Sequence, residues 1–92
     1  MRLKVSYSGQ ARAAAGCGSE DFELPNATTL RELLLAIASR HGERMAALVE
    51  TAARGAPAVL VFIGGEQVIW EAPPPVLKDG GEVMLVSPIS GG

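Results

Sequence analysis

The segment "TTLRELLLAIASRHG", residues 28–42, has the pattern of an amphipathic helix. Glu32 follows Thr29 at the spacing of a capping box, in which each side chain accepts a hydrogen bond from the other residue's backbone amide. Gly42 closes the pattern, as expected of a left-handed terminator. The apolar side of the predicted helix repeats at helical spacing and is made of Leu30, Leu33, Leu34 and Ile37, with His41 at its end. The segment therefore predicts one dominant helix.

Two strand patterns precede this helix. "RLKVSYS", residues 2–8, alternates Leu3, Val5 and Tyr7 with polar residues, which is the period-two pattern of a strand with one buried face. "DFELP", residues 21–25, predicts a second strand that ends at a proline. The Ala-rich connection between them has room for one or two helical turns, and its length favours an antiparallel pair.

The second half of the chain adds a shorter helix and three more strands. "ERMAALVETAARG", residues 43–55, repeats the helical spacing more weakly. "PAVLVFIGGEQVIW", residues 57–70, predicts a hairpin inside a well-covered sheet, turning at its glycine pair, and "EVMLVSP", residues 82–88, predicts the last strand. Strands grouped around one main helix define an α+β architecture, in which a sheet packs its apolar face on that helix.

Composition limits the classes of function. The chain has 92 residues, 8 Lys and Arg against 10 Asp and Glu, and a formal net charge of −2, so we expect one domain that does not bind nucleic acid. The single cysteine, Cys17, favours a reducing compartment. The longest apolar run is far shorter than the roughly 20 residues of a membrane helix, and the N-terminus has no apolar signal core. These features predict a soluble cytoplasmic protein without membrane contact.

Few side chains offer catalytic chemistry. His41 has no nearby sequence motif that supplies a second metal ligand or a triad partner, so a structural role is favoured. Cys17 lies between two glycines with no evident cation to lower its pKa, and we interpret it as an ordinary thiol. No metal site is expected.

The chain ends in "SPISGG", residues 87–92. Pro88 fixes its own φ and cannot donate to a sheet ladder, so the chain leaves the sheet there. The segment 88–92 predicts a flexible tail that, when extended, reaches about 16 Å. Its last two residues have no side chains and fit a narrow channel of another protein. A terminal glycine pair is equally compatible with a loose end that does nothing.

Nearly the whole chain resembles the MoaD/ThiS family of β-grasp, ubiquitin-like sulfur carriers, and it is most similar to the small subunit of molybdopterin synthase. The resemblance rests on "KVSYSGQARAAAG" (4–16), on the helix segment 28–42 and, most specifically, on "LKDGGEVMLVSPISGG" (77–92). It implies a single β-grasp domain over residues 1–92, with a mixed sheet of about five strands on one main helix.

The resemblance also implies the chemistry. The terminal carboxylate of Gly92 is adenylated by a ubiquitin-activating-type adenylyltransferase and then converted to a thiocarboxylate. ATP and Mg²⁺ belong to that partner, and the carrier binds no stable cofactor. The carrier is not an enzyme on its own. Its tail enters the large catalytic subunit of molybdopterin synthase, or another sulfur-accepting enzyme. The inserted tail is formed by Pro88, Ile89, Ser90 and Gly91.

An apolar docking surface beside the tail is expected from the same resemblance, around Tyr7, Val86 and Ile89. Core packing is the alternative for these residues, and for Tyr7 the two alternatives weigh equally. Ser87 precedes Pro88 where molybdopterin-type members have a second proline, which weakens the assignment of one acceptor. Carriers for thiamin, cysteine or tRNA thiolation, and a protein modifier conjugated through Gly92, stay open as alternatives.

Overall fold

The computed structural model describes residues 1–53, 59–69 and 76–87. The strands are β1 (Arg2–Gly9), β2 (Ser19–Glu23), β3 (Leu60–Ile63), β4 (Glu66–Gln67) and β5 (Glu82–Ser87). The helices are α1 (Gln10–Ala15), α2 (Leu30–His41) and α3 (Glu43–Ala53). This order confirms the predicted α+β architecture. The second predicted helix is not short, because α3 has 11 residues against 12 in α2. Within the described residues, no helix has both the length and the apolar character that a membrane crossing requires.

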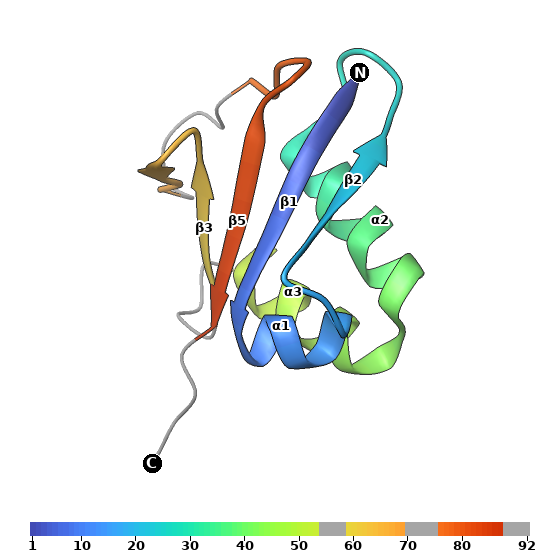
Figure 1. Cartoon of the computed structure of the whole chain (residues 1–92), viewed down its shortest axis with the longest axis vertical. Helices are drawn as coiled ribbons and strands as arrows, with labels where there is room; N and C mark the ends of the chain where they lie inside the picture. Colours follow the sequence, from blue (N-terminus) through green and yellow to red (C-terminus); the bar gives the residue numbers. More distant parts are fainter. Residues whose placement is uncertain (54–58, 70–75, 88–92) are drawn as a thin grey trace.

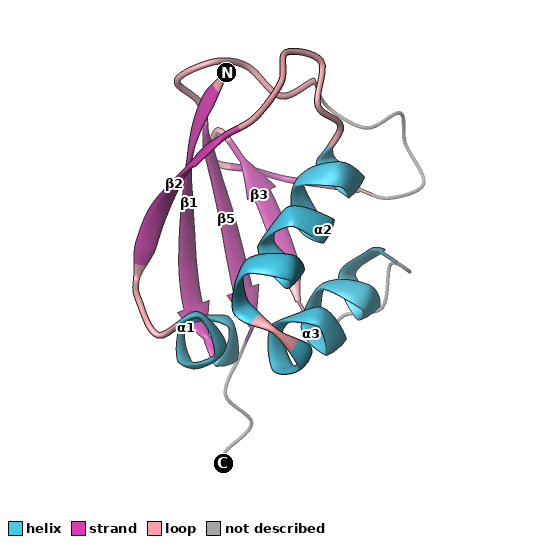
Figure 2. Cartoon of the chain, turned by 90° about the vertical axis from the view of Figure 1, so that its right-hand side faces the viewer, coloured by secondary structure: helices cyan, strands magenta, loops and turns pink. Residues whose placement is uncertain are grey.

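The strands form one mixed sheet in the order β2-β1-β5-β3-β4. β1 and β5 pair in parallel at the centre, whereas β2 pairs with β1, and β3 with β5 and β4, in antiparallel fashion. α2 and α3 lie on one side of the sheet, while the side that faces the viewer in Figure 1 carries no helix across its strands. Figure 2 shows this layering edge-on.

The core lies between the sheet and the helices. Alternate residues of the central strands point inward, so that Val5 pairs with Val83 and Tyr7 with Leu85 across the parallel ladder. The apolar side of α2 covers them with the buried residues Leu30, Leu33, Leu34 and Ile37. α3 adds Met45 and Val49, and β2 adds Phe22. The period-two and helical patterns of the sequence therefore meet in one core.

Both ends of α2 are fixed by local contacts. The backbone amide of Glu32 donates to Thr29 Oγ1 over 3.1 Å, and the backbone amide of Thr29 donates to Glu32 Oε1 over 3.1 Å, which confirms the capping box. Gly42 ends the helix as predicted, but with φ 90° and ψ −166° it is not in the left-handed helical region. The reason is that α3 begins at once. The carbonyl of Gly42 accepts the first bond of α3, from the amide of Ala46, over 2.9 Å.

The turn before β5 is fixed onto β1. The amide of Gly80 donates to the carbonyl of Arg2 over 2.7 Å, and the amide of Arg2 donates to Asp79 Oδ1 over 2.7 Å. Gly80 has φ 79°, and a Cβ at Gly81 would lie 2.9 Å from the carbonyl oxygen of Lys78. Both positions therefore require glycine. This turn places β5 in register beside β1.

The hairpin of β3 and β4 turns at Gly64 and Gly65 as predicted, but it is not inside a well-covered sheet. β4 is a two-residue strand at the edge. Of the β3 residues, Val61 is buried, whereas Phe62 is only partly covered because its side of the sheet has no helix. Val59 and Val68, which flank the two strands, are buried. Residues 57–58 and Trp70 of the predicted hairpin lie outside the described residues.

Replacement of Leu33 by Ala will lower the free energy of unfolding by about 2 to 5 kcal/mol, because the side chain is fully buried and its removal leaves a cavity. Urea unfolding followed by circular dichroism measures the loss. Leu35→Ala is the matched control, since Leu35 lies on the same helix but is 64% exposed. Equal losses for the two variants would show that the described core is wrong.

Candidate functional site

The end of β5 is the described point that leads into the predicted reactive tail. Ser87 is 1% exposed and pairs with Gly9, the last residue of β1, and α1 begins directly after Gly9. β5 therefore finishes at the end of the sheet where α1 lies. The predicted tail residues lie outside the described part of the chain: Pro88, Ile89, Ser90, Gly91 and Gly92. Their roles stay predictions.

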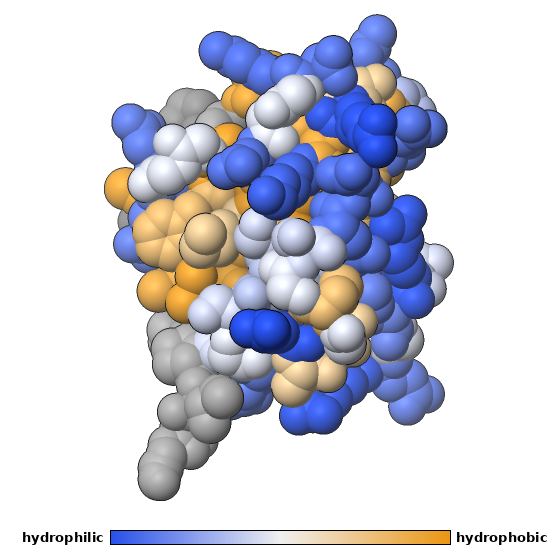
Figure 3. Space-filling model, viewed as in Figure 1, coloured by the Kyte–Doolittle hydropathy of each residue, from blue (hydrophilic) through white to orange (hydrophobic). Residues whose placement is uncertain are grey.

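An apolar surface lies on the uncovered face of β3 and β5. We call it the outer patch and define it by Leu60, Phe62, Met84 and Val86. Met84 pairs with Phe62, and Val86 with Leu60, across the antiparallel ladder, so the four side chains share one face. They line a hollow of about 420 Å³ together with Ser6 and Glu82. Figure 3 views this face and shows apolar side chains gathered over β3 and β5.

The apolar side chains of the outer patch are not fully covered by the rest of the chain. Met84 is 44% exposed, and Leu60, Phe62 and Val86 are each partly exposed. Contiguous apolar side chains on an open sheet face are typical of a protein-binding surface. Charged residues adjoin the patch, because Glu82 pairs with Lys4 at the start of β5. The arrangement is that of an apolar centre with a polar rim.

The two docking residues predicted within the described chain lie on opposite faces of the sheet. Val86 belongs to the outer patch. Tyr7 is only 5% exposed and belongs to the core cluster, so it offers almost no surface to a partner. The core alternative is therefore the correct one for Tyr7. The cause is the alternation of β1, which places Tyr7 on the same face as Leu3 and Val5.

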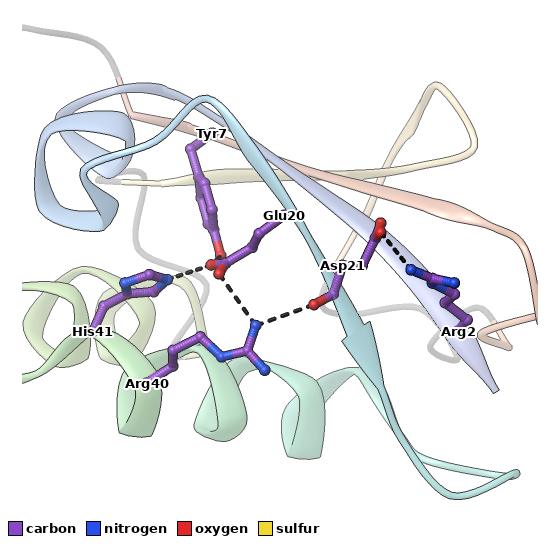
Figure 4. Close-up of polar contacts among 6 residues, drawn as sticks. All are labelled: Arg2, Tyr7, Glu20, Asp21, Arg40 and His41. Carbon is purple, nitrogen blue, oxygen red and sulfur yellow. Dashed lines mark hydrogen bonds and ion pairs between the residues drawn. The ribbon is translucent and has the colours of Figure 1, made fainter.

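A polar cluster occupies the opposite face, between the sheet and the last turn of α2 (Figure 4). Glu20 of β2 lies at its centre. Tyr7 donates its hydroxyl hydrogen to Glu20 Oε2, and His41 Nε2 lies in contact with the same oxygen. Arg40 donates to Glu20 Oε1 over 3.1 Å. One carboxylate thus joins β1, β2 and α2, and His41 has the structural role that the sequence favoured.

These contacts shift two pKa values in opposite directions. Burial, and then the hydrogen bond to Glu20, raise the pKa of the Tyr7 hydroxyl well above its ordinary value. Burial acts to raise the pKa of Glu20, but the hydrogen bonds from Tyr7, His41 and Arg40 outweigh it, and the pKa of Glu20 is lowered. The cluster therefore holds an ionised carboxylate beside a neutral phenol.

Arg40 also fastens α2 to the backbone of β2. Its guanidinium donates to the carbonyl of Asp21 over 3.1 Å and lies 3.8 Å from the centre of the Phe22 ring. Arg2 forms a 3.0 Å ion pair with Asp21 on the far side. In the described part of the chain, no group of three or more His, Cys, Asp or Glu side chains is placed to hold a metal ion.

Two features of this site were missed from the sequence, namely Glu20 and the residues of the outer patch other than Val86. Glu20 had no visible signal, because its partners Tyr7 and His41 are 13 and 21 positions away and the contacts depend on the strand register. The outer patch had a signal. Met84 and Val86 alternate with the buried Val83 and Leu85, so β5 has apolar residues on both faces. A strand exposed on one face does not need that pattern.

Comparison with known proteins gives the family. A model described as the ThiS family matches residues 5–92. The chain belongs to the ThiS family. This membership confirms the resemblance to MoaD/ThiS carriers, and the β-grasp, ubiquitin-like fold agrees with the five-stranded mixed sheet and its main helix. In this ThiS-family chain the match extends across both the outer patch and the terminal glycines.

Individual relatives agree with this assignment. A molybdopterin synthase sulfur carrier subunit from Chlamydomonas reinhardtii is 29% identical over 92 residues, which covers 100% of both chains. A putative molybdopterin converting factor subunit 1 from Pyrococcus furiosus is 27% identical with a TM-score of 0.69, over 97% of this chain and 99% of that one. A chain of the BexX/CysO complex from Amycolatopsis orientalis is 26% identical with a TM-score of 0.66, over 98% and 99%.

Tyr7→Phe will lower the free energy of unfolding at neutral pH by about 1 to 3 kcal/mol, because it removes a buried hydrogen bond to a charged acceptor and keeps the ring in the core. Urea titration at several pH values measures the effect. The loss will be smaller in acid, where Glu20 becomes protonated and its bond from Tyr7 weakens. A variant as stable as the parent at neutral pH would contradict the described contact.

Proposed function

We propose that this chain is a sulfur carrier whose reactive group is the carboxylate of Gly92. The observation that carries the proposal is the family match, which runs to residue 92 and so includes the glycine pair. The proposal takes Gly92 as the last residue of the working protein, which the experiment below tests. The carrier acts as a non-catalytic subunit, and the partners supply the catalytic groups.

The proposed reaction has two stages. The Gly92 carboxylate attacks the α-phosphate of ATP on an adenylyltransferase, and pyrophosphate leaves. Adenylation turns a poor electrophile into one with a good leaving group, and Mg²⁺ held by that partner neutralises the phosphates. A persulfide sulfur then attacks the acyl carbon and AMP leaves. A second thiol reduces the resulting acyl disulfide and releases the thiocarboxylate.

The acceptor that we propose is the large subunit of a molybdopterin synthase, which uses the sulfur in molybdenum cofactor biosynthesis. Two relatives support this choice, since they are named a molybdopterin synthase sulfur carrier subunit and a putative molybdopterin converting factor subunit 1. The second solved structure, a complex that contains CysO, keeps a carrier for another acceptor as the second candidate.

The outer patch is the proposed docking surface for these partners. It lies on β5, the strand that leads directly to Pro88, so a partner bound there lies next to the start of the tail. Val86 is one residue from the end of β5, which makes the patch and the tail one continuous element of recognition. Apolar burial at the patch would provide affinity, and the tail would provide the reactive group.

Deletion of Gly92 will abolish adenylation by the cognate adenylyltransferase and leave the unfolding transition nearly unchanged, because one terminal residue contributes little to stability. ATP–pyrophosphate exchange measures the first effect and calorimetry the second. Tandem mass spectrometry of the native C-terminal peptide must locate a sulfur-for-oxygen exchange on Gly92. Adenylation that persists after the deletion would overturn the proposal, and conjugates to lysine side chains would favour a modifier.

Met84→Asp will weaken binding to the large subunit by about tenfold or more, because it places a charge in the centre of the outer patch. Leu35→Asp is the matched control, since Leu35 is also an exposed apolar residue but lies on α2, on the other side of the sheet. Isothermal titration calorimetry compares the two. If the two variants bind the large subunit with equal affinity, the outer patch is not the docking surface.

A further inference from the structure

The last turn of α2 is held differently from the rest of the helix. Along the first turns, Leu30, Leu33, Leu34 and Ile37 are all buried against the sheet. After Ile37 no residue of α2 is fully buried. The turn that contains Arg40 and His41 instead meets β2 through the polar cluster.

Glu20 is the residue on which those contacts converge. Its side chain is 18% exposed and receives His41 and Tyr7 on one oxygen and Arg40 on the other. Two of these partners come from the end of α2, and the third comes from β1. Loss of the negative charge on Glu20 therefore weakens all of these contacts at once.

The junction behind this turn is short and is bridged by backbone hydrogen bonds. Gly42 is the single residue between α2 and α3, with its amide bonded to Ala38 and its carbonyl to the amide of Ala46, each over 2.9 Å. α3 keeps its own apolar anchors in Met45 and Val49. Release of the last turn of α2 can therefore be a local event that leaves the core packed.

We propose that Glu20 is an acid-sensitive latch that holds the last turn of α2 and the α2–α3 junction against the sheet. The latch is closed while Glu20 is ionised and opens when the carboxylate takes up a proton. This inference does not depend on the proposed function, because it rests on contacts among described residues alone.

The charged and titratable groups around the latch set the direction of its pH dependence. Tyr7 faces Glu20 from β1, Arg40 and His41 face it from α2, and Cys17 lies near enough to act on Tyr7. The pKa of Glu20 is lowered from 4.5 in the folded chain. A lowered carboxyl pKa contributes stability that is present above the unfolded value and is lost as the pH falls through the folded value. The latch is therefore closed at neutral pH and opens in acid.

The latch lies near the end of the sheet that leads to the tail. Tyr7 pairs with Leu85 in the parallel ladder, two residues before Ser87, the last residue of β5. Its opening would free the last turn of α2 on the helix side of the sheet, opposite the outer patch. Opening of the latch therefore does not have to change the outer patch, because the two lie on opposite faces of the sheet.

Hydrogen exchange of the full chain tests the latch. Protection of each amide, corrected for its intrinsic exchange rate, is measured by NMR from about pH 7 to about pH 3. The amides of Gly42 and Ala46 report on the junction, and the amide of Leu33, which donates to Thr29, reports on the other end of α2. In the parent chain, protection at Gly42 and Ala46 will fall in acid by about tenfold more than at Lys4, whose amide donates to the carbonyl of Gly81 before β5. Protection at Leu33 will also fall, because acid removes the charge of Glu32 in the capping box.

Glu20→Gln will give that low protection at Gly42 and Ala46 already at neutral pH, with little further change in acid. Glu32→Gln is the matched control, because Glu32 is also a carboxylate with a lowered pKa but belongs to the capping box at the other end of α2. It will reduce protection near Leu33 and leave the junction as in the parent chain.

Two results would overturn the latch. One is protection at Gly42 and Ala46 that is the same in Glu20→Gln and the parent chain at every pH. The other is a simultaneous loss of protection at all amides of the parent chain in acid, which would indicate global unfolding. If Glu20→Gln does not fold, His41→Gln removes one partner from the cluster and must weaken the same two amides. No change at these amides in that variant would also overturn the proposal.

Discussion

The parallel pairing of β1 with β5 determines most of the architecture. It places the first described strand beside the last one at the centre of the sheet. Parallel neighbours finish at the same end of the sheet, which places Ser87 beside Gly9 and the start of α1. At the opposite end of the sheet, the turn Asp79–Gly81 is hydrogen-bonded to Arg2, and these bonds fix where β5 begins. This pairing therefore determines at which end of the sheet β5 finishes.

The two faces of the sheet differ in how far their apolar side chains are buried. The inner face supplies the core and pays the conformational cost of folding, with Val5, Tyr7, Val83 and Leu85 under α2. The outer face keeps Met84 and Val86 partly exposed, which adds little to the stability of the free chain. An apolar surface of this kind gains its burial only in a complex. Under the function proposed above, a carrier that presents its own terminus to a partner needs such a surface more than it needs catalytic side chains.

Local sequence signals predicted the parts of the fold that depend on local physics. The capping box of Thr29 and Glu32 and the alternation of Leu3, Val5 and Tyr7 all appear in the structure. The same alternation placed Tyr7 in the core, and the docking role came only from family resemblance. Glu20 could not be found, because the strand register brings it to Tyr7 and the α2 packing brings it to His41. The predicted reactive tail consists of residues 88–92, which the described structure does not include.

The two edge strands bear on the proposal that partners dock on a face of the sheet. β2 is one edge strand, and Arg40 of α2 already occupies the carbonyl of Asp21, while Arg2 pairs with its carboxylate. β4 is the other edge, and it is only two polar residues long, Glu66 and Gln67. A short or charged edge with its acceptors occupied is a poor template for an added strand. These edges therefore favour the proposed docking through side chains of β3 and β5 over extension of the sheet, and β5 is the last described strand of the chain.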